Sequence, residues 1–183
     1  MIQDKSVIRK SDQWQGRRFA FAVCGGIGAV ESVKSIRELR RHGADITAFL
    51  TPSALRFITE LSVSWAAAKP AICQPDAAVE HLDPFDWVIV APTTLNTLAA
   101  CANGLTENAV TLLAASQLGR RGRIAFVPAM NAQLSAHPLY AEYRARLQSW
   151  GADFYPSAEE EGRFKMPAPE ALASWLLELT NAR

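Results

Sequence analysis

Short runs of apolar residues alternate along the chain with stretches in which apolar residues recur at every third or fourth position. The runs are typical of strands buried on both faces of a sheet, and the spaced residues are typical of amphipathic helices. Five strands are expected, at residues 19–24, 45–50, 87–91, 123–127 and 153–155. Helices are expected at residues 30–42, 51–61, 95–103, 107–118, 138–150 and 169–181. This alternation predicts an α/β fold with a doubly wound, mostly parallel sheet of the Rossmann-like kind.

One domain accounts for the whole pattern, because a chain of 183 residues has the length of a single domain. We assign residues 18–183 to that domain. Residues 1–17 are mostly polar and form an N-terminal lead that we expect to be mobile. The pattern weakens between residues 62 and 84, where three prolines predict an irregular surface segment.

Composition and charge argue against several classes of protein. The 19 basic and 18 acidic residues leave a formal net charge of +1, which provides no broad field to attract nucleic acid or an anionic membrane. No apolar run approaches the roughly 20 residues of a membrane-spanning helix, and the first residues do not resemble a signal peptide. The three cysteines are far apart, so neither a disulfide framework nor a metal site is predicted. We therefore expect a cytoplasmic protein that binds neither nucleic acid nor membranes.

Three turns follow strands whose carboxyl ends should meet at one edge of the sheet, where doubly wound folds bind ligands. The first consists of Gly25, Gly26, Ile27 and Gly28. Its backbone N–H groups, at the start of a helix, suit a phosphate. The spacing differs from the dinucleotide fingerprint and no acidic residue follows the second strand, so NAD is disfavoured. The alternative is that these glycines serve only a tight turn.

The second turn carries hydroxyl and amide side chains that can both donate and accept hydrogen bonds. It consists of Thr93, Thr94, Leu95, Asn96 and Thr97. Such groups suit a phosphate ester or the polar edge of a heterocycle, although one threonine could simply cap the following helix. The third turn, residues 128–131, could be an ordinary loop when judged alone.

Five segments in order resemble the motifs of the homo-oligomeric flavin-containing cysteine decarboxylases. That family includes phosphopantothenoylcysteine decarboxylase and the lantibiotic peptidyl-cysteine decarboxylases. The similar segments are residues 25–29, 51–53, 91–97, 102–108 and 128–131. The resemblance covers residues 18 to 180 and implies FMN as the cofactor, a small-molecule substrate, and a homotrimer or dodecamer.

The resemblance also implies which residues hold the cofactor. It places the FMN phosphate on the glycine turn and on Thr94, and the flavin ring near the other polar residues of the turns. The cofactor-binding residues expected in this way are Gly25, Gly26, Ile27, Gly28, Thr51, Ser53, Thr93, Thr94, Leu95, Asn96, Thr97 and Met130.

Two departures from the family concern proton transfer. Decarboxylases of the family carry a His eight residues before the Asp that opens the third strand, and counting back from Asp86 gives Ala78. They also carry a Cys eight residues before a Met in a mobile flap, and here Met166 leads back to Ala158. A methyl group cannot transfer a proton. The candidate catalytic residues that remain are His81 and Asn131.

A complete flavin site without these two donors favours an FMN-dependent oxidoreductase. Such an enzyme would pass electrons through the flavin to a small heterocycle such as a dihydropterin, as the dihydromethanopterin reductase-like members of this fold do. Two alternatives stay open. One is a phosphopantothenoylcysteine-type decarboxylase that uses His81 and another donor, and the other is a flavin-binding protein without catalysis.

Overall fold

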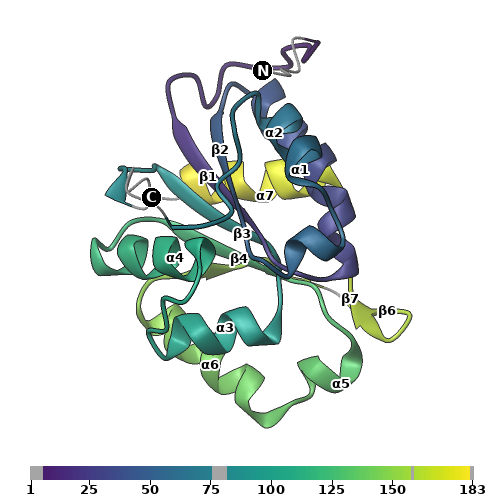
Figure 1. The fold of residues 1–183 in the computed structure, drawn as a ribbon, viewed down its shortest axis with the longest axis vertical. Coiled ribbons are helices and arrows are strands. Elements are labelled where there is room, and N and C mark those ends of the chain that lie inside the picture. The colour runs from purple at the N-terminus through teal and green to yellow at the C-terminus, as the bar shows by residue number, and fades with distance from the viewer. Residues whose placement is uncertain (1–5, 76–81, 158, 182–183) are drawn as a thin grey trace.

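Strands and helices alternate in the order that the sequence predicts (Figure 1). The computed structural model describes residues 6–75, 82–157 and 159–181. The strands are Arg18–Val23 (β1), Asp45–Leu50 (β2), Trp87–Thr93 (β3), Ile124–Pro128 (β4), Asp153–Phe154 (β5), Glu159–Glu160 (β6) and Arg163–Phe164 (β7). The α-helices are Ser32–Arg41 (α1), Glu60–Ala67 (α2), Leu95–Ala102 (α3), Ala109–Gly119 (α4), Ala132–Ser135 (α5), Pro138–Ser149 (α6) and Pro169–Asn181 (α7). Within the described ranges, no helix has the length and apolar character needed to cross a membrane.

The central sheet has the strand order β2-β1-β3-β4-β5, and every pair of neighbours is parallel. Helices α1, α2 and α7 pack on one face, and α3, α4 and α6 pack on the other. The side chains of β1 alternate between the two: Phe19 and Phe21 join the first core, and Ala20 and Ala22 join the second. Because both faces are covered, β1 and β3 are almost entirely buried, which explains their unbroken apolar sequences. The prediction of a doubly wound parallel sheet is confirmed.

Strand order reverses at β1, which lies between β2 and β3. The chain leaves β1 toward the face of the sheet that α1 covers, and it leaves β3 toward the face that α3 covers. Because the two connections diverge, a crevice forms at the carboxyl ends of these neighbouring strands. The three turns that the sequence analysis singled out follow β1, β3 and β4, so all of them lie at this edge.

The segment after β2 differs from the expected helix at 51–61. It holds only a 3₁₀ turn at Ala54–Arg56, and α2 begins at Glu60. The hydroxyl of Thr51 accepts the Ala54 N–H (3.2 Å), which closes a local turn. The hydroxyl of Thr59 accepts the Ser62 N–H (3.1 Å) and so supplies the true N-cap.

The N-terminal lead also differs from the expectation, because its last part packs against the domain. The N–H groups of Lys10 and Ser11 donate to the carbonyl of Arg41, at 2.7 and 3.2 Å. The Trp14 N–H donates to the carbonyl of His42 (2.9 Å), and the Trp14 side chain is 1% exposed. The lead thus satisfies carbonyl groups at the end of α1 that the helix itself leaves without partners.

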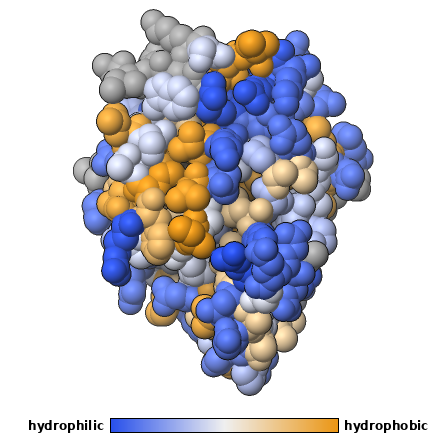
Figure 2. Space-filling model, turned by 90° about the vertical axis from the view of Figure 1, so that its right-hand side faces the viewer, coloured by the Kyte–Doolittle hydropathy of each residue, from blue (hydrophilic) through white to orange (hydrophobic). Residues whose placement is uncertain are grey.

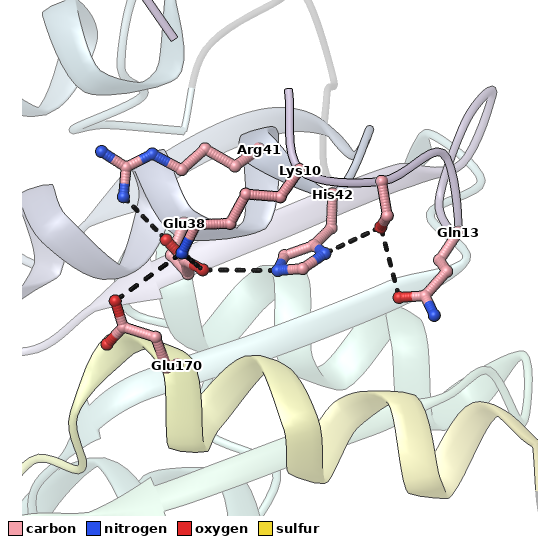
Figure 3. A network of polar contacts seen from close by, with 7 residues as sticks. Lys10, Gln13, Glu38, Arg41, His42 and Glu170 are labelled. Carbon is pink, nitrogen blue, oxygen red and sulfur yellow. Dashed lines mark hydrogen bonds and ion pairs between the residues drawn. The ribbon is translucent and has the colours of Figure 1, made fainter. Parts of the chain in front are cut away.

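A buried carboxylate fastens this lead to two helices (Figure 3). Glu38 of α1 is 1% exposed and accepts hydrogen bonds from Lys10 (2.6 Å) and Arg41 (2.8 Å), while His42 lies at 3.3 Å. Lys10 also lies 3.8 Å from Glu170 of α7. Burial by itself would raise the pKa of Glu38, but the hydrogen bonds and charges of Lys10 and Arg41 outweigh it and lower that pKa. Glu38 is therefore a charged residue inside the fold.

Candidate functional site

A cleft of about 620 Å³ opens at the carboxyl ends of β1, β3 and β4. It is lined by Gly25–Gly28, Val30 and Glu31 after β1, by Thr94 after β3, by Ala129–Asn131 and Leu134 after β4, and by Arg163–Met166. The first three groups include residues of the three predicted turns, which the fold therefore brings together. The sequence analysis named no binding or catalytic residue in the fourth group, although it counted back from Met166 when it compared this segment with the family's flap.

The glycine turn is shaped by close packing rather than by unusual backbone angles. A Cβ on Gly25 would lie 2.5 Å from Ser53 Oγ and 2.7 Å from the Ser53 carbonyl carbon, so only glycine allows the two turns to meet. Gly26 has an extended backbone, and a Cβ there would be in ordinary contact with Thr94, 3.9 Å from its Cγ2. Gly28 leaves space that the Met166 side chain occupies. The turn thus presents a backbone surface to the cleft.

The two threonines after β3 have different surroundings. The Thr93 hydroxyl is fully buried, donates to the Val90 carbonyl and accepts the Val127 N–H (3.3 Å), so it lies within the sheet. The Thr94 hydroxyl accepts the Thr97 N–H (3.2 Å) and donates to Thr97 Oγ1 (3.1 Å) at the start of α3. Thr94 lines the cleft, and Thr93 is not among the cleft-lining residues.

Five other predicted cofactor-binding residues lie near the cleft without lining it. Thr51 and Ser53 bond each other through their hydroxyls (3.0 Å) directly behind Gly25. In α3, Thr97 is buried, Leu95 is half-buried and Asn96 is exposed. Their roles in binding stay predictions.

The turn after β4 forms the base of the cleft. Met130 is 7% exposed, and Asn131 caps α5 by accepting the Leu134 N–H on its side-chain oxygen (2.9 Å). The N–H groups of Met130 and Phe164 each donate to the other residue's carbonyl, at 3.1 and 2.8 Å. Ala132 donates in the same way to the carbonyl of Gly162 (2.8 Å). These bonds attach the hairpin β6-β7 to the base.

The sequence analysis compared the segment from Ala158 to Met166 with the family's flap, but it predicted neither the hairpin nor its place at the cleft. Its strands have two residues each and are joined by Glu161 and Gly162, whose φ angles are +51° and +69°. Two consecutive residues with positive φ are typical of a type I′ turn. The acidic run before Gly162 gave no alternation of apolar and polar residues, so the only available signal was a glycine in a polar segment.

The three cysteines lie in surroundings that raise their pKa values. Burial raises the pKa of Cys24 to about 11 and that of Cys101 to about 12. Burial, together with the nearby charge of Glu60, raises the pKa of Cys73 to about 11. All three stay protonated at neutral pH, and none of them lines the cleft.

Three positions that mattered for the predicted chemistry, Ala78, His81 and Ala158, lie outside the described residues. Asn131 is the one predicted catalytic residue that the structure places, and it lines the cleft.

The curated relatives of this chain are proteins of coenzyme A biosynthesis. It is 30% identical over 170 residues to the coenzyme A biosynthesis bifunctional protein CoaBC of Thermococcus kodakarensis, covering 89% of this chain and 42% of that protein. It is 31% identical over 151 residues to CoaBC of Escherichia coli, covering 75% of this chain and 36% of that protein. The chain therefore spans about two fifths of the length of these relatives.

Solved structures share its fold at low sequence identity. The FMN-binding protein AtHal3 superposes with a TM-score of 0.78 at 20% identity, covering 91% of this chain and 98% of that one. A mutant PPC decarboxylase complexed with pantothenoylaminoethenethiol gives 0.77 at 21% identity, covering 90% and 98%. The epidermin biosynthesis protein EpiD from Staphylococcus aureus gives 0.75 at 18%, covering 87% and 99%.

These likenesses overturn the prediction of an oxidoreductase that reduces a dihydropterin. The relatives are CoaBC proteins and one structural neighbour is a PPC decarboxylase, so the comparisons favour the decarboxylase alternative of the sequence analysis over a pterin reductase. The prediction was wrong because it treated the alanines at 78 and 158 as evidence for another reaction. Loss of a proton donor impairs one step, but it leaves the fold and the cofactor site unchanged.

The family itself is shown by a match along almost the whole chain. The profile of the Flavoprotein family matches residues 7–181, which include every element of the sheet and all four segments that line the cleft. The prediction of a flavin-containing protein is thereby confirmed. This chain belongs to the Flavoprotein family.

Proposed function

We propose that this protein is an FMN-dependent decarboxylase of a small cysteine-ended substrate of the phosphopantothenoylcysteine type. The observation that carries the proposal is the cleft at the switch point of the sheet, where the glycine turn, Thr94 and the Met130-Asn131 turn converge under a hairpin. CoaBC relatives at 30% and 31% identity support the choice of substrate class.

The cofactor is FMN, and the residues of the cleft suit it. The side-chain-free surface of Gly25 and Gly26, beside the Thr94 hydroxyl, suits the phosphate. Met130 and Phe164 provide the apolar surface that an aromatic ring system requires. When bound, FMN would take two electrons from the substrate thiol, which makes loss of the neighbouring carboxylate as carbon dioxide favourable, and would return them to the decarboxylated product.

The chain's own residues bind and orient the substrate. The bond from the Leu134 N–H to the Asn131 side-chain oxygen fixes that amide, so its NH₂ group is the part left to donate to a substrate oxygen. Backbone bonds hold the hairpin against residues 130–132, next to Asn131. His81 is our candidate for protonating the product, since methyl groups stand at 78 and 158.

An apolar patch beside the cleft supports assembly into a homotrimer or into a dodecamer made of four trimers. We define this patch as Ile27, Val30, Leu55 and Phe57, which are 68%, 45%, 42% and 42% exposed. In the view of Figure 2, hydrophobic side chains gather on one part of the surface. Val30 lines both the cleft and the groove of about 430 Å³ that Leu55 and Phe57 form. A second subunit on this patch would therefore lie next to the flavin.

Release of carbon dioxide tests the enzymatic proposal. Protein loaded with FMN is mixed with phosphopantothenoylcysteine, and carbon dioxide and the thiol product are measured. We expect turnover in the wild type and a loss of roughly a hundredfold in Asn131→Ala and His81→Asn, with FMN retained. Bound FMN without carbon dioxide release would reject the proposal in favour of a flavin-binding protein without this activity.

Light scattering tests assembly. We expect a mass that is a multiple of three 20.0 kDa subunits, and smaller species for Leu55→Glu combined with Phe57→Glu. Leu105→Glu is the control, because Leu105 is similarly exposed (49%) but lies outside the patch. A wild-type monomer that binds FMN tightly would contradict the proposal.

A further inference from the structure

Two cations of the hairpin stand at the rim of the cleft. Arg163 and Lys165 both line it, and their side chains are 50% and 37% exposed. The other charged residue in the lining, Glu31, already has a partner in Lys34 (3.0 Å). The charged residues that line the cleft are therefore two cations and one carboxylate, a net positive set.

The two cations share one carboxylate at the tip of the hairpin. Glu161 Oε2 lies 2.7 Å from Lys165 Nζ and 3.3 Å from Arg163 Nη2, and Lys165 also lies 3.3 Å from Glu160. Exposed ion pairs of this kind are weak and exchange readily. Glu161 and Glu160 can therefore be displaced from the cations by an anion of higher charge.

The conformation of Glu161 indicates that its carboxylate matters at this position. Its φ of +51° belongs to the left-handed region, which type I′ turns usually fill with Asn, Asp or Gly. A glutamate costs more backbone strain there than those residues do. Its side chain bonds both cations, which is a property that Gly cannot provide.

Backbone bonds hold the segment that carries these cations against the cleft. The paired backbone bonds between Phe164 and Met130, and the bond from Ala132 to Gly162, tie the residues on either side of Arg163 to the base. Asn131 and Arg163 also form a bridge between the two segments. The cations are thus positioned before a ligand arrives.

We propose that Arg163 and Lys165 bind the phosphate of the substrate, and that Glu161 occupies them while the cleft is empty. The inference rests on the proposed function. A phosphate ester carries nearly two charges and three acceptor oxygens, so it outcompetes a single carboxylate for a guanidinium and an ammonium.

The geometry assigns the cations to the phosphate rather than to the carboxylate that leaves. An ion pair stabilises a carboxylate in its charged form and so opposes its loss as carbon dioxide. Met130, which is buried, and Phe164, which is half-buried, give apolar surface that suits the reacting end, and the more exposed Arg163 and Lys165 suit the phosphate, which keeps its charge throughout.

Calorimetry with two unreactive probes tests this inference. FMN-loaded protein is titrated with phosphopantothenate and with pantothenate, which differ only in the phosphate. We expect the phosphorylated probe to bind at least about tenfold more tightly to the wild type, and the preference to vanish in Arg163→Met combined with Lys165→Met. Glu161→Gln should bind the phosphorylated probe severalfold more tightly, with no change for pantothenate.

Lys69→Met is the matched control, because it removes one positive charge from a residue that pairs with Asp45 and does not line the cleft. The flavin absorption spectrum verifies that each variant is folded and loaded. An undiminished preference in the double variant, or no binding of either probe, would overturn the inference. If the double variant instead loses FMN but still binds riboflavin, the cations serve the phosphate of the cofactor and the assignment to substrate is wrong.

The failure of this inference is distinguishable from failure of the proposed function. Equal kcat/KM for phosphorylated and unphosphorylated cysteine-ended substrates would remove the phosphate site but keep the decarboxylase. Phosphate-dependent binding without carbon dioxide release would keep the phosphate site but reject the decarboxylase.

Discussion

At Thr93 and Thr94, two adjacent hydroxyls carry different tasks, and substitutions should separate them. Thr93→Val leaves the buried Val127 N–H without an acceptor, so we expect the free energy of unfolding to fall by about 1–3 kcal/mol with FMN affinity unchanged. Thr94→Val removes a helix cap at a cost of about 1 kcal/mol and should also weaken FMN binding. Urea unfolding of the apoprotein and FMN titration measure the two effects, and equal loss of FMN affinity in both variants would contradict this division.

Glu38 should make stability depend on acid. Its pKa is lowered in the folded protein, so its contribution is present above the usual value of 4.5 and is lost as the pH falls through the folded value. Glu38→Gln should lower the free energy of unfolding at pH 7 by about 3–5 kcal/mol, because Lys10 and Arg41 lose a buried partner. Chemical unfolding between pH 7 and 3 checks this: the difference between wild type and variant should shrink toward acid. A constant difference would contradict the lowered pKa.

Helix α4 offers a test of whether a residue in a family-like motif stabilises its own helix or serves the cofactor. Asn108 lies in the segment 102–108 that resembles a family motif, and it forms a capping box with Thr111 at the start of α4. Asn108→Ala should therefore lower the free energy of unfolding by about 1 kcal/mol while FMN affinity stays the same. Asn103→Ala, the same change in the same segment, serves as the comparison. The Asn103 side chain caps no helix N-terminus and instead donates to the Ala99 carbonyl at the end of α3. A loss of FMN in Asn108→Ala would show that the residue serves the cofactor.

Elements with strong local signals were predictable from the sequence. Strands β1 and β3 are apolar throughout because both faces are covered, and the turns after them are marked by glycines and hydroxyls. The segment 51–61 was misassigned because Thr51 and Thr59 both carry helix-start signals, and only packing selects between them. The hairpin was not predicted because backbone bonds to residues 130–132, thirty or more positions away, hold it in place. The three turns of the cleft were thus predictable from the sequence, but the way the flap-like segment packs against them came only from the fold.

For the whole molecule, the docked lead links the chain's beginning to its core. The Trp14 ring lies 5.2 Å from that of Phe19 and 5.7 Å from that of His42, at the edge of the sheet opposite the cleft. Trp14→Ala should lower the free energy of unfolding by about 3–5 kcal/mol without changing the affinity of the folded protein for FMN. Trp150→Ala is the control, because Trp150 is 47% exposed and its removal should change the free energy of unfolding far less. Unfolding curves and FMN titration measure both, and equal destabilisation by the two variants would refute the core role of Trp14.

Val30 belongs to two surfaces at once, the wall of the cleft and the apolar patch. If one side chain contacts both the cofactor and a neighbouring subunit, we expect a favourable coupling between the two binding equilibria, and any such coupling acts by the same factor in both directions. Flavin content then depends on protein concentration: dilution should release FMN at a concentration where subunits separate, and added FMN should shift the mass distribution toward the assembled form. Fluorescence of released flavin, followed through a dilution series, would then have its midpoint at the same protein concentration as the separation of subunits.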